Sequence, residues 1–499
     1  MEEESKLLPA FLLDYQEAGV KKIIKAVNDN YKGFLLSWDM GLGKTVGALT
    51  IYFMMPYRFK RLIVLAPKNT LGQWQREIKK FFNREAQILD SANFSKIGNS
   101  AEILITNYES FVAIETKTPG FFSFAKTTLI VLDEASKVKN RDTKAAVAIR
   151  DKRGEAFLLA MTGTPLENDL REFWNIMCLI DPQIIPAGVF YSQHCCFDWV
   201  VIRGGSRKRI VTGYKNYEAF RKRIEPYFLR KTKEEVVPDM IKKQFTVYRI
   251  QRTNFQKALE QQVKGYCLQY IQAKVDEGKS LTNVAFFSLG FLRMIEDDPR
   301  LLISSNSKIM ENKQELPIGA LDRGAKMFAL LEVLKKKSQE EQKKVIVFTQ
   351  YKKMVDILEG ELAREGFSTI AVYGALSLKQ REAKLEEFKT TNKILLATDA
   401  FAYGTNLQEA DVLINYDLPW NPARRKQRID RVHRLGITSA KEIYDLISDG
   451  IDEHVYEILK TKEEIFQQAV EGKEPMKLRS FILKSVYGNE LKGIRKRDR

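Results

Sequence analysis

Short apolar runs recur in two series along the 499-residue chain, and they constrain its fold more than any other feature. In the first series each run ends at polar or turn residues, and helix-length segments such as 45–55 and 70–82 lie between runs. Runs of this kind are typical of buried parallel strands joined by crossover helices. The expected strands lie in GFLLSW (33–38), RLIVLAP (61–67), EILIT (102–106), TLIVLDE (128–134) and FLLAMTG (157–163).

The same rhythm returns in the last third of the chain, without close sequence identity to the first series. We therefore predict an α/β protein with two parallel-sheet units whose repetition is architectural. The expected strands of the second unit lie in KVIVFTQ (344–350), STIAVYG (368–374), KILLATD (393–399), DVLINYD (411–417) and EIYDLIS (442–448).

The region between the two series lacks this rhythm. Its segment 254–278 is charged, contains no proline and has a helical composition. We therefore expect a first unit over 1–182, a helical insertion and linker over 183–320, and a second unit over 321–465. A basic C-terminal segment over 466–499 completes the division; its last part (476–499) carries eight basic and two acidic residues, which suit either nucleic acid or a solvated terminus.

The charge balance points to a polyanionic partner. Lys and Arg number 81 against 64 Asp and Glu, a net charge of +17. Nucleic acid is the simplest such partner, and an anionic membrane surface or mere solubility are the alternatives. Four cysteines do not make a disulfide framework, so a reducing compartment is expected. The acidic MEEESK start is unlike a signal peptide, and no apolar run approaches the ~18 residues of a membrane helix, so we expect a soluble intracellular protein.

The segment GFLLSWDMGLGKT (33–45) combines a strand, a glycine-rich turn and the start of a helix. This is the context that a phosphate-binding loop needs. Gly41 and Gly43 allow backbone N–H groups to face phosphate oxygens, Lys44 supplies a charge for the β- and γ-phosphates, and Thr45 offers a hydroxyl to Mg²⁺. Trp38 stands where the motif usually has its first glycine. A chance GKT in a loop is the alternative.

A carboxylate pair follows the strand in VLDEAS (131–136). Asp133 is suited to hold the Mg²⁺ shell beside the loop, and Glu134 to orient and deprotonate an attacking water. Alone, such a pair is also common as a surface turn. In MTGTPLEN (161–168), Thr162 and Thr164 are candidates for sensing a γ-phosphate, or residues of a simple turn.

The second unit contains NPARRKQRIDRVHRLG (421–436). In a helix Gln427, Arg431 and Arg434 share one face, from which a guanidinium can stabilise the transition state of phosphoryl transfer. A solvated basic helix or a DNA-facing surface fits the same spacing. His194-Cys195-Cys196 has no complementary pair at zinc-finger spacing, so we read it as part of a loop. Trp74 and Trp420 are read as core residues or residues near DNA.

In order and spacing these motifs resemble a superfamily-two helicase-type motor, and within that superfamily the Swi/Snf-like DNA translocases. The resemblance runs from about residue 10 to 465 and includes LLDYQEAGV, DMGLGKT, LAPKNTLGQWQREIKKF, DEAS, TGTPLEN, FLRKTKEEVVPDM, VIVFTQYKKMVDIL, ATDAFAYGTNLQEADVLINYDLPWNP and QRIDRVHRLG. Ser136 replaces the usual His of the DEAH-type motif, and Ile437 replaces the usual Gln after the last motif.

The resemblance implies two RecA-like lobes with a helical insertion, an ATP site with Mg²⁺, and DNA across both lobes. It implies catalytic roles for Lys44, Asp133, Glu134 and the arginine fingers Arg431 and Arg434, and Mg²⁺ ligation by Thr45 and Asp133. The implied nucleotide-binding residues are Gln16 as adenine reader, Asp39, Met40, Gly41, Leu42, Gly43, Lys44, Thr45, Gly404 and Gln427. Motif position implies DNA contacts at Lys68, Asn69, Thr106, Asn107, Gln350 and Thr398.

The function expected on these grounds is an ATP-dependent motor that translocates on double-stranded or branched DNA. A strand-separating helicase, a nucleosome remodeller and an inactive DNA-binding scaffold are the alternatives. We expect a monomer without membrane association, cytoplasmic in a prokaryote or a virus-infected host and nuclear in a eukaryote.

Overall fold

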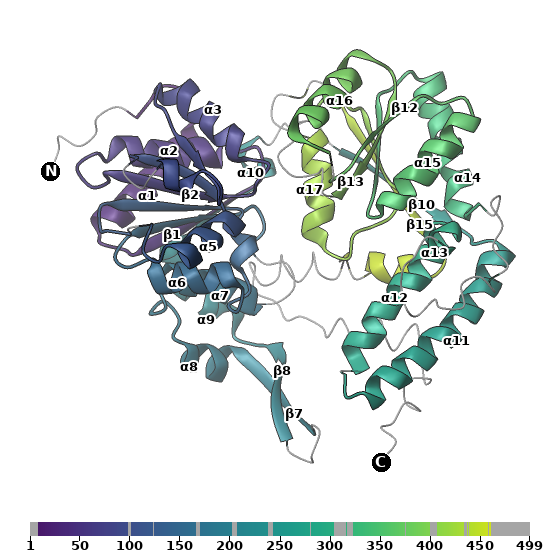
Figure 1. Cartoon of the computed structure of the whole chain (residues 1–499), viewed down its shortest axis with the longest axis horizontal. Coiled ribbons are helices and arrows are strands. Elements are labelled where there is room, and N and C mark those ends of the chain that lie inside the picture. The colour runs from purple at the N-terminus through teal and green to yellow at the C-terminus, as the bar shows by residue number, and fades with distance from the viewer. Residues whose placement is uncertain are drawn as a thin grey trace. The chain divides into compact units, whose positions relative to one another are not determined.

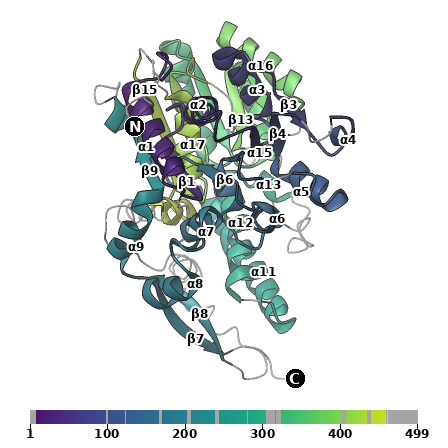
Figure 2. The same ribbon diagram turned by 90° about the vertical axis from the view of Figure 1, so that its left-hand side faces the viewer.

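The computed structural model describes residues 8–460 apart from 98–100, 123, 166–169, 202–206, 238–242, 280, 304–315, 317–322, 375, 400–406, 434–436, 438 and 458. The described residues divide into two compact units (Figures 1 and 2). The first unit comprises the residues up to 196 and 214–240. The second comprises 197–213 and the described residues from 241 onward.

The first unit contains a seven-stranded parallel sheet with the strand order β3-β4-β2-β5-β6-β1-β9. Its strands are β1 (Gly33–Trp38), β2 (Arg61–Ala66), β3 (Gln87–Leu89), β4 (Ile103–Asn107), β5 (Thr128–Asp133), β6 (Phe157–Met161) and β9 (Phe228–Lys231). Helix α1 (Asp14–Asn28) precedes the first strand. The helices that lie between strands along the chain are α2 (Lys44–Met54), α3 (Leu71–Phe82), α4 (Phe94–Ile97), α5 (Tyr108–Lys117), α6 (Lys144–Lys152) and α7 (Leu170–Ile180).

The inner strands of this sheet are almost entirely buried, and only one residue each of β2 and β5 is partly exposed. Every residue of β1, β4 and β6 is buried, because helices cover both faces of the sheet. The five strands that the apolar runs predict are confirmed. Strands β3 and β9 were not predicted, because they are short and lie at the two edges of the sheet, where a continuous apolar run is not required.

The second unit contains a six-stranded parallel sheet with the strand order β10-β15-β14-β11-β13-β12. Its strands are β10 (Lys243–Ile250), β11 (Val345–Thr349), β12 (Thr369–Val372), β13 (Ile394–Thr398), β14 (Val412–Asn415) and β15 (Lys441–Ser448). Helices α14 (Ala325–Leu334), α15 (Lys352–Arg364), α16 (Leu378–Thr390) and α17 (Pro422–Val432) accompany the sheet.

Alternation along β11 assigns these helices to the two faces of the sheet. Val345 and Val347 belong to one apolar cluster, with side chains of α14 and α15. Ile346 and Phe348 belong to another, with side chains of α16 and α17. Successive residues of a strand point to opposite faces, so this sheet is buried on both sides. The predicted α/β class with two parallel-sheet units is thus confirmed.

Residues 183–320 are more varied than the helical insertion expected from the sequence. They include α8 (Ala187–Val189), α9 (Tyr217–Ile224), α10 (Lys233–Val236), α11 (Asn254–Asp276), α12 (Leu281–Asp297) and α13 (Arg300–Ile303), and a separate two-stranded sheet of β7 (Cys195–Val201) and β8 (Arg207–Tyr214). They also supply β9 to the first sheet and β10 to the second. Every residue of β10 (KQFTVYRI) except Ile250 is at least partly exposed, as suits an edge strand.

Helices α11 and α12 pack side by side (Figures 1 and 2). The buried side chains of α11 recur every four residues, from Leu259 through Val263, Cys267 and Ile271 to Val275, and so form one apolar stripe. The predicted helix over 254–278 is therefore confirmed. In the part of the chain described here, no helix combines the length and apolar character needed to cross a membrane.

Candidate functional site

The predicted phosphate loop joins β1 to α2 at the carboxyl edge of the first sheet. Gly41 and Gly43 have φ angles of 88° and 78°, in the left-handed region that side-chain-bearing residues avoid. A Cβ atom on Gly43 would lie 2.2 Å from Nε2 of Gln16. Glycine is therefore required at this position both by backbone conformation and by the approach of a neighbouring side chain.

Lys44 is the first residue of α2, and its ammonium group is held within the loop. Its Nζ donates hydrogen bonds to the carbonyl oxygens of Trp38 (2.8 Å) and Asp39 (3.2 Å). Gly163, in the turn after β6, also lies at the loop, because a Cβ built on it would be 3.7 Å from the backbone nitrogen of Met40 and 3.9 Å from Lys44 Nζ. The TGT segment and the GKT segment therefore meet, as two parallel strands ending at one edge require.

Gln16 of α1 contacts the same loop. Its amide Nε2 donates to the carbonyl oxygen of Leu42 at 3.1 Å, and its Oε1 accepts from the backbone N–H of Leu13 at 3.0 Å. The hydroxyl of Tyr15 also donates to the Leu42 oxygen, at 3.0 Å. These contacts bring the predicted adenine-reading residue next to the glycine-rich turn.

Asp133 ends strand β5, two strands away from β1, and Glu134 follows it. Asp133 Oδ2 accepts a hydrogen bond from the indole Nε1 of Trp74 at 2.9 Å. Burial raises the pKa of Asp133, while the Trp74 hydrogen bond and the charge of Lys44 act to lower it. Glu134 has a φ of 54°, a left-handed conformation that costs of order 1–3 kcal/mol and is found often at functional sites.

The contact between Trp74 and Asp133 is one that the sequence did not reveal. Its side chain is only 1% exposed, so the expectation that it packs in the core is confirmed. Its indole N–H nevertheless reaches a carboxylate that is 59 residues away in sequence. No local pattern signals such a pair, because it depends on where α3 packs against the sheet.

The segment FLRKTKEE, seen above only as a family motif, contacts the phosphate loop. Strand β9 pairs with β1 so that Arg230 lies opposite Ser37. An Arg230 guanidinium nitrogen lies 3.8 Å from a carboxylate oxygen of Asp39, and Nη1 donates to the carbonyl oxygen of Gly163 at 3.4 Å. The backbone N–H of Lys233 donates to the other Asp39 oxygen at 3.3 Å. Asp39 is 2% exposed, so this segment fixes a buried carboxylate of the loop.

Thr162 and Thr164 form a turn between β6 and α7. Thr162 is fully buried, and its Oγ1 accepts a hydrogen bond from the backbone N–H of Thr164 at 3.1 Å. This is the local hydroxyl-to-backbone bond of a turn, the plainer of the two readings of this segment.

Helix α17 carries two of the predicted residues of the second unit. Asn421 caps the helix by accepting from the backbone N–H of Ala423, and Pro422 is its first residue. Gln427 is 8% exposed and Arg431 is 4% exposed. Gly404 and Arg434 lie outside the described residues.

The residues predicted to contact DNA lie in the last positions of β4 and β13 or just after β2 and β11, but their surroundings differ. Lys68 is exposed and Asn69 is partly exposed. Thr106 is fully buried and donates to the carbonyl oxygen of Leu89 at 2.8 Å, and Asn107 caps α5 by accepting from the N–H of Ser110. These two side chains are thus used within the unit.

In the second unit, the predicted DNA contacts Gln350 and Thr398 differ in the same way. Gln350 is partly exposed, and its amide donates to Asp417 Oδ1 at 3.2 Å and to the carbonyl oxygen of Leu418 at 3.0 Å. Thr398, at the end of β13, is 5% exposed.

A cavity of about 720 Å³ in the first unit lies away from this site. Its lining includes residues that precede β1, β5 and β6, namely Asn30–Lys32, Lys126 and Arg153–Glu155, so it opens at the amino edge of the sheet. Arg153 donates to the carbonyl oxygens of Leu179 and Ile180, which anchor its guanidinium in the fold. Open α/β sheets bind ligands at the opposite, carboxyl edge.

Comparison with known families matches residues 15–301 to the SNF2-related domain and residues 325–436 to the helicase conserved C-terminal domain. The chain belongs to the SNF2-related family. The resemblance drawn from the sequence motifs is thereby confirmed.

Curated relatives include a probable chromatin-remodeling complex ATPase chain of Oryza sativa, 27% identical over 91% of this chain and 41% of the rice protein. They also include a putative ATP-dependent helicase/translocase, YwqA, of Bacillus subtilis, 27% identical over 94% of this chain and 50% of that protein. The chain thus spans half or less of the length of these relatives. A solved structure of the Sulfolobus solfataricus SWI2/SNF2 ATPase core in complex with dsDNA is 24% identical over 97% of both chains, with a TM-score of 0.41.

Proposed function

We propose that the chain hydrolyses ATP to move along double-stranded DNA, and that it acts on branched DNA or on protein–DNA complexes. The observation that carries this proposal is the meeting of four sequence motifs at one edge of the first sheet. Gln16, Lys44, Asp133 and Gly163 come from four different elements and converge on the phosphate loop or the strand end beside it. Membership of the SNF2-related family supports the same function.

In this proposal Lys44 holds the β- and γ-phosphates of ATP, and Gln16 binds the adenine. The turn at Gly41 and Gly43, with no room for a Cβ at Gly43, suits the close approach of a phosphate to backbone N–H groups. Asp39, Met40 and Leu42 complete the loop. Arg230 acts on the loop indirectly, because it pairs with the Asp39 carboxylate.

Mg²⁺ suits the oxygen donors present here, and Thr45 and Asp133 are the residues that would hold it. When bound, it neutralises charge on the phosphate oxygens. Asp133 is kept available by Trp74, whose hydrogen bond favours the ionised carboxylate. Glu134 orients water and accepts its proton, and its left-handed backbone directs it away from the path of the strand.

In the second unit, Arg431 and Arg434 are proposed to stabilise charge in the transition state, with Gln427 and Gly404 as nucleotide-binding neighbours. DNA phosphates are proposed to meet Lys68, Asn69 and Gln350, whose side chains are at least partly exposed. Thr106, Asn107 and Thr398 then act by shaping the ends of β4 and β13, the strands that pair with β2 and β11. The division into two lobes, an insertion and a basic tail is kept as part of the proposal, as are a monomeric state and a nuclear or cytoplasmic location.

The deciding experiment measures ATP hydrolysis with single-stranded, duplex, forked and four-way DNA, together with strand displacement on the fork. A duplex translocase is expected to be stimulated by duplex and to displace few strands. Strong displacement would favour a helicase, and greater stimulation by nucleosomes than by free duplex would favour a remodeller. Absence of ATP hydrolysis with every DNA would refute the proposal and favour a binding scaffold.

Two variants make the same experiment specific to the site. Lys44→Ala is expected to abolish hydrolysis while leaving the fold and DNA binding intact. Glu134→Gln is expected to bind ATP and DNA but to stop turnover. Exposed Lys68→Ala is the matched lysine control, which should keep the maximum rate at saturating DNA. Near-wild-type hydrolysis by Lys44→Ala would rule out the phosphate-loop assignment.

A further inference from the structure

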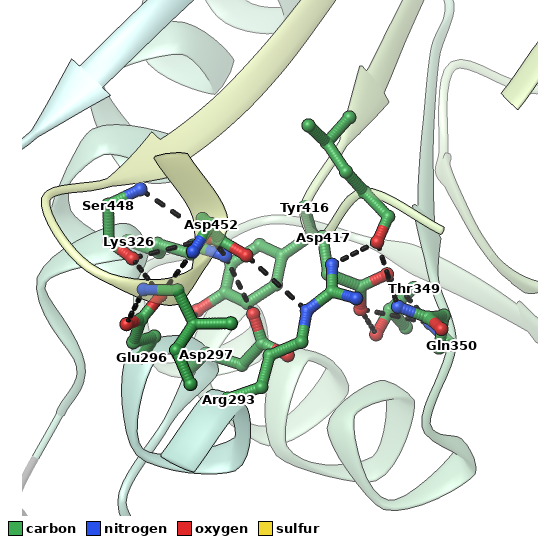
Figure 3. A network of polar contacts seen from close by, with 12 residues as sticks. Arg293, Glu296, Asp297, Lys326, Thr349, Gln350, Tyr416, Asp417, Ser448 and Asp452 are labelled. Carbon is green, nitrogen blue, oxygen red and sulfur yellow. Dashed lines mark hydrogen bonds and ion pairs between the residues drawn. The ribbon is translucent and has the colours of Figure 1, made fainter. Parts of the chain in front are cut away.

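A buried cluster of charged side chains lies in the second unit, where α12 meets the sheet (Figure 3). Arg293, Asp297, Lys326, Asp417 and Asp452 are all fully buried. Such groups are costly to remove from water, and they are retained where each is paired and where a unique arrangement is needed. We therefore examine which parts of the second unit these side chains hold in place.

Asp417 is the member of the cluster that contacts the proposed DNA-binding end of β11. Its Oδ2 accepts from the hydroxyl of Thr349 at 2.5 Å and from the backbone N–H of Gln350 at 2.9 Å. Its Oδ1 accepts from the Gln350 side-chain amide at 3.2 Å. One carboxylate thus fixes both the main chain and the side chain of Gln350 (Figure 3).

Asp417 also fixes helix α17 through Arg428. The Arg428 guanidinium donates to the Asp417 carbonyl oxygen at 2.7 Å and lies 3.4 Å from the Asp417 carboxylate. It further donates to Asp399 at 2.5 Å and to Asn415 at 3.1 Å. Arg428 is fully buried and lies between Gln427 and Arg431, so its contacts set the rotation and axial position of the helix that carries both residues.

The remaining contacts connect the chain at Asp417 and Leu418 to helix α12. Arg293 of α12 donates to the carbonyl oxygen of Leu418, the residue after Asp417, and lies 3.3 Å from Asp452. The charge of Asp417 acts on Arg293 directly. Lys326 lies 2.7 Å from Asp297 and also pairs with Asp452. Asp452 belongs to this half of the cluster, where it pairs with Arg293 and Lys326 and accepts hydrogen bonds from Ser448.

We propose that Asp417 is a positioning residue that holds Gln350 and α17 in one mutual arrangement, so that DNA contact and ATP turnover depend on each other. Asp417 touches neither ATP nor DNA in this account. The inference rests on the proposed function for its catalytic readout, because it assigns Gln350 to DNA and Arg431 to ATP turnover. The ordering of α17 by Asp417 can be measured whether or not Gln350 contacts DNA and Arg431 acts in ATP turnover.

The test compares Asp417→Asn with Asp452→Asn in the full-length chain. Both variants replace one buried carboxylate of the same cluster with an amide of equal size. Only Asp417→Asn removes the charge that faces Arg428 and one acceptor shared by Gln350. Because a misplacement of about 1 Å can cost about 10²-fold in rate, we expect the DNA-stimulated kcat of Asp417→Asn to fall by that order and its DNA half-saturation to rise. Asp452→Asn is expected to change both by no more than a few-fold.

Stability is controlled by measuring both variants well below their melting temperatures. Amide hydrogen exchange over residues 422–432 is followed in parallel and should rise in Asp417→Asn alone. If Asp417→Asn does not fold, Arg428→Lys takes its place, since a lysine keeps the charge but cannot reproduce the four contacts of the guanidinium. The same losses in kcat and protection are expected for it.

The outcomes separate this inference from the proposed function. Equal kcat, equal half-saturation and equal exchange in the two Asn variants would overturn the positioning role. A wild-type chain without DNA-stimulated hydrolysis would refute the proposed function instead, and exchange of α17 then decides the positioning role by itself. Protection lost only in Asp417→Asn would support it, and protection retained would overturn it.

Discussion

Replacement of Trp74 by phenylalanine tests how the fold controls the carboxylate that we assign to Mg²⁺. The Trp74 indole N–H donates to Asp133 at 2.9 Å from a position that is 1% exposed. Burial raises the pKa of Asp133, and the Trp74 hydrogen bond opposes that rise. Trp74→Phe keeps an aromatic ring in the core but removes the donor. The pKa of Asp133 should therefore rise further.

The size of the effect follows from the hydrogen bond. A hydrogen bond to a charged group contributes about 1.5–3 kcal/mol. Loss of the Trp74 bond removes this stabilisation from the ionised carboxylate, so the pKa of Asp133 is expected to rise. A higher pKa leaves less ionised carboxylate at acidic pH, so activity is lost there first and returns as pH rises. The acidic limb of kcat/KM for ATP should therefore move to higher pH.

The assay is steady-state ATP hydrolysis against pH at saturating DNA. Trp174→Phe is the matched control, because Trp174 is also 1% exposed and its indole donates to a backbone oxygen, that of Ile185, at 2.8 Å. Both variants lose a buried hydrogen bond and some stability, but only Trp74→Phe should move the acidic limb. An unmoved limb, or an equal shift in both variants, would refute the role given to Trp74.

Three further predictions address the second unit and the DNA. Arg431→Ala should leave ATP binding nearly intact and lower kcat by about 10³-fold or more. Arg424→Ala, at an exposed position of the same helix, should leave kcat unchanged. A normal kcat with weaker DNA binding in Arg431→Ala would contradict this prediction. Duplex affinity should fall with salt at a log–log slope of about −0.9 per phosphate contacted, and Lys68→Ala should reduce that slope by about one; a flat response would exclude phosphate contacts as the main source of affinity. Burial raises the pKa of Glu296 to about 7 and of Asp297 to about 8, above the usual value of about 4, so the free energy of unfolding of the second unit should fall as pH rises from about 4 to about 8. Urea denaturation should show this fall, and Asp297→Asn should reduce it.

The strands that the sequence predicts are those that packing constrains most. A strand such as β5 is buried on both faces, so its residues must be apolar in succession, and TLIVLD is visible as a run. The edge strands β9 and β10 pair with their sheets through backbone hydrogen bonds and need no such run. The apolar runs did not predict them for that reason, although β9 lies inside the family motif FLRKTKEEVVPDM.

The same distinction applies to the candidate site. Gly43 and Lys44 stand out in the sequence because a tight glycine-rich turn before a helix restricts which residues fit at fixed spacing. The φ of 78° at Gly43 shows that glycine is favoured at this turn. The pairs Trp74–Asp133 and Arg230–Asp39 join residues 59 and 191 positions apart, and they arise from the packing of α3 and the pairing of β9 with β1. The spacing of residues within a motif predicts neither pair.

The roles of individual basic residues cannot be predicted from the net charge. Net charge of +17 points to a polyanion, but it treats Lys68 and Arg428 as equal contributions. Lys68 is exposed after β2, whereas Arg428 is fully buried and bound to Asp399, Asn415 and Asp417. A DNA phosphate can therefore contact Lys68, whereas the guanidinium of Arg428 is engaged in contacts that order α17. Basic residues of this chain therefore have two roles: some are exposed at the surface, and others order the buried interior. Only burial distinguishes the two groups.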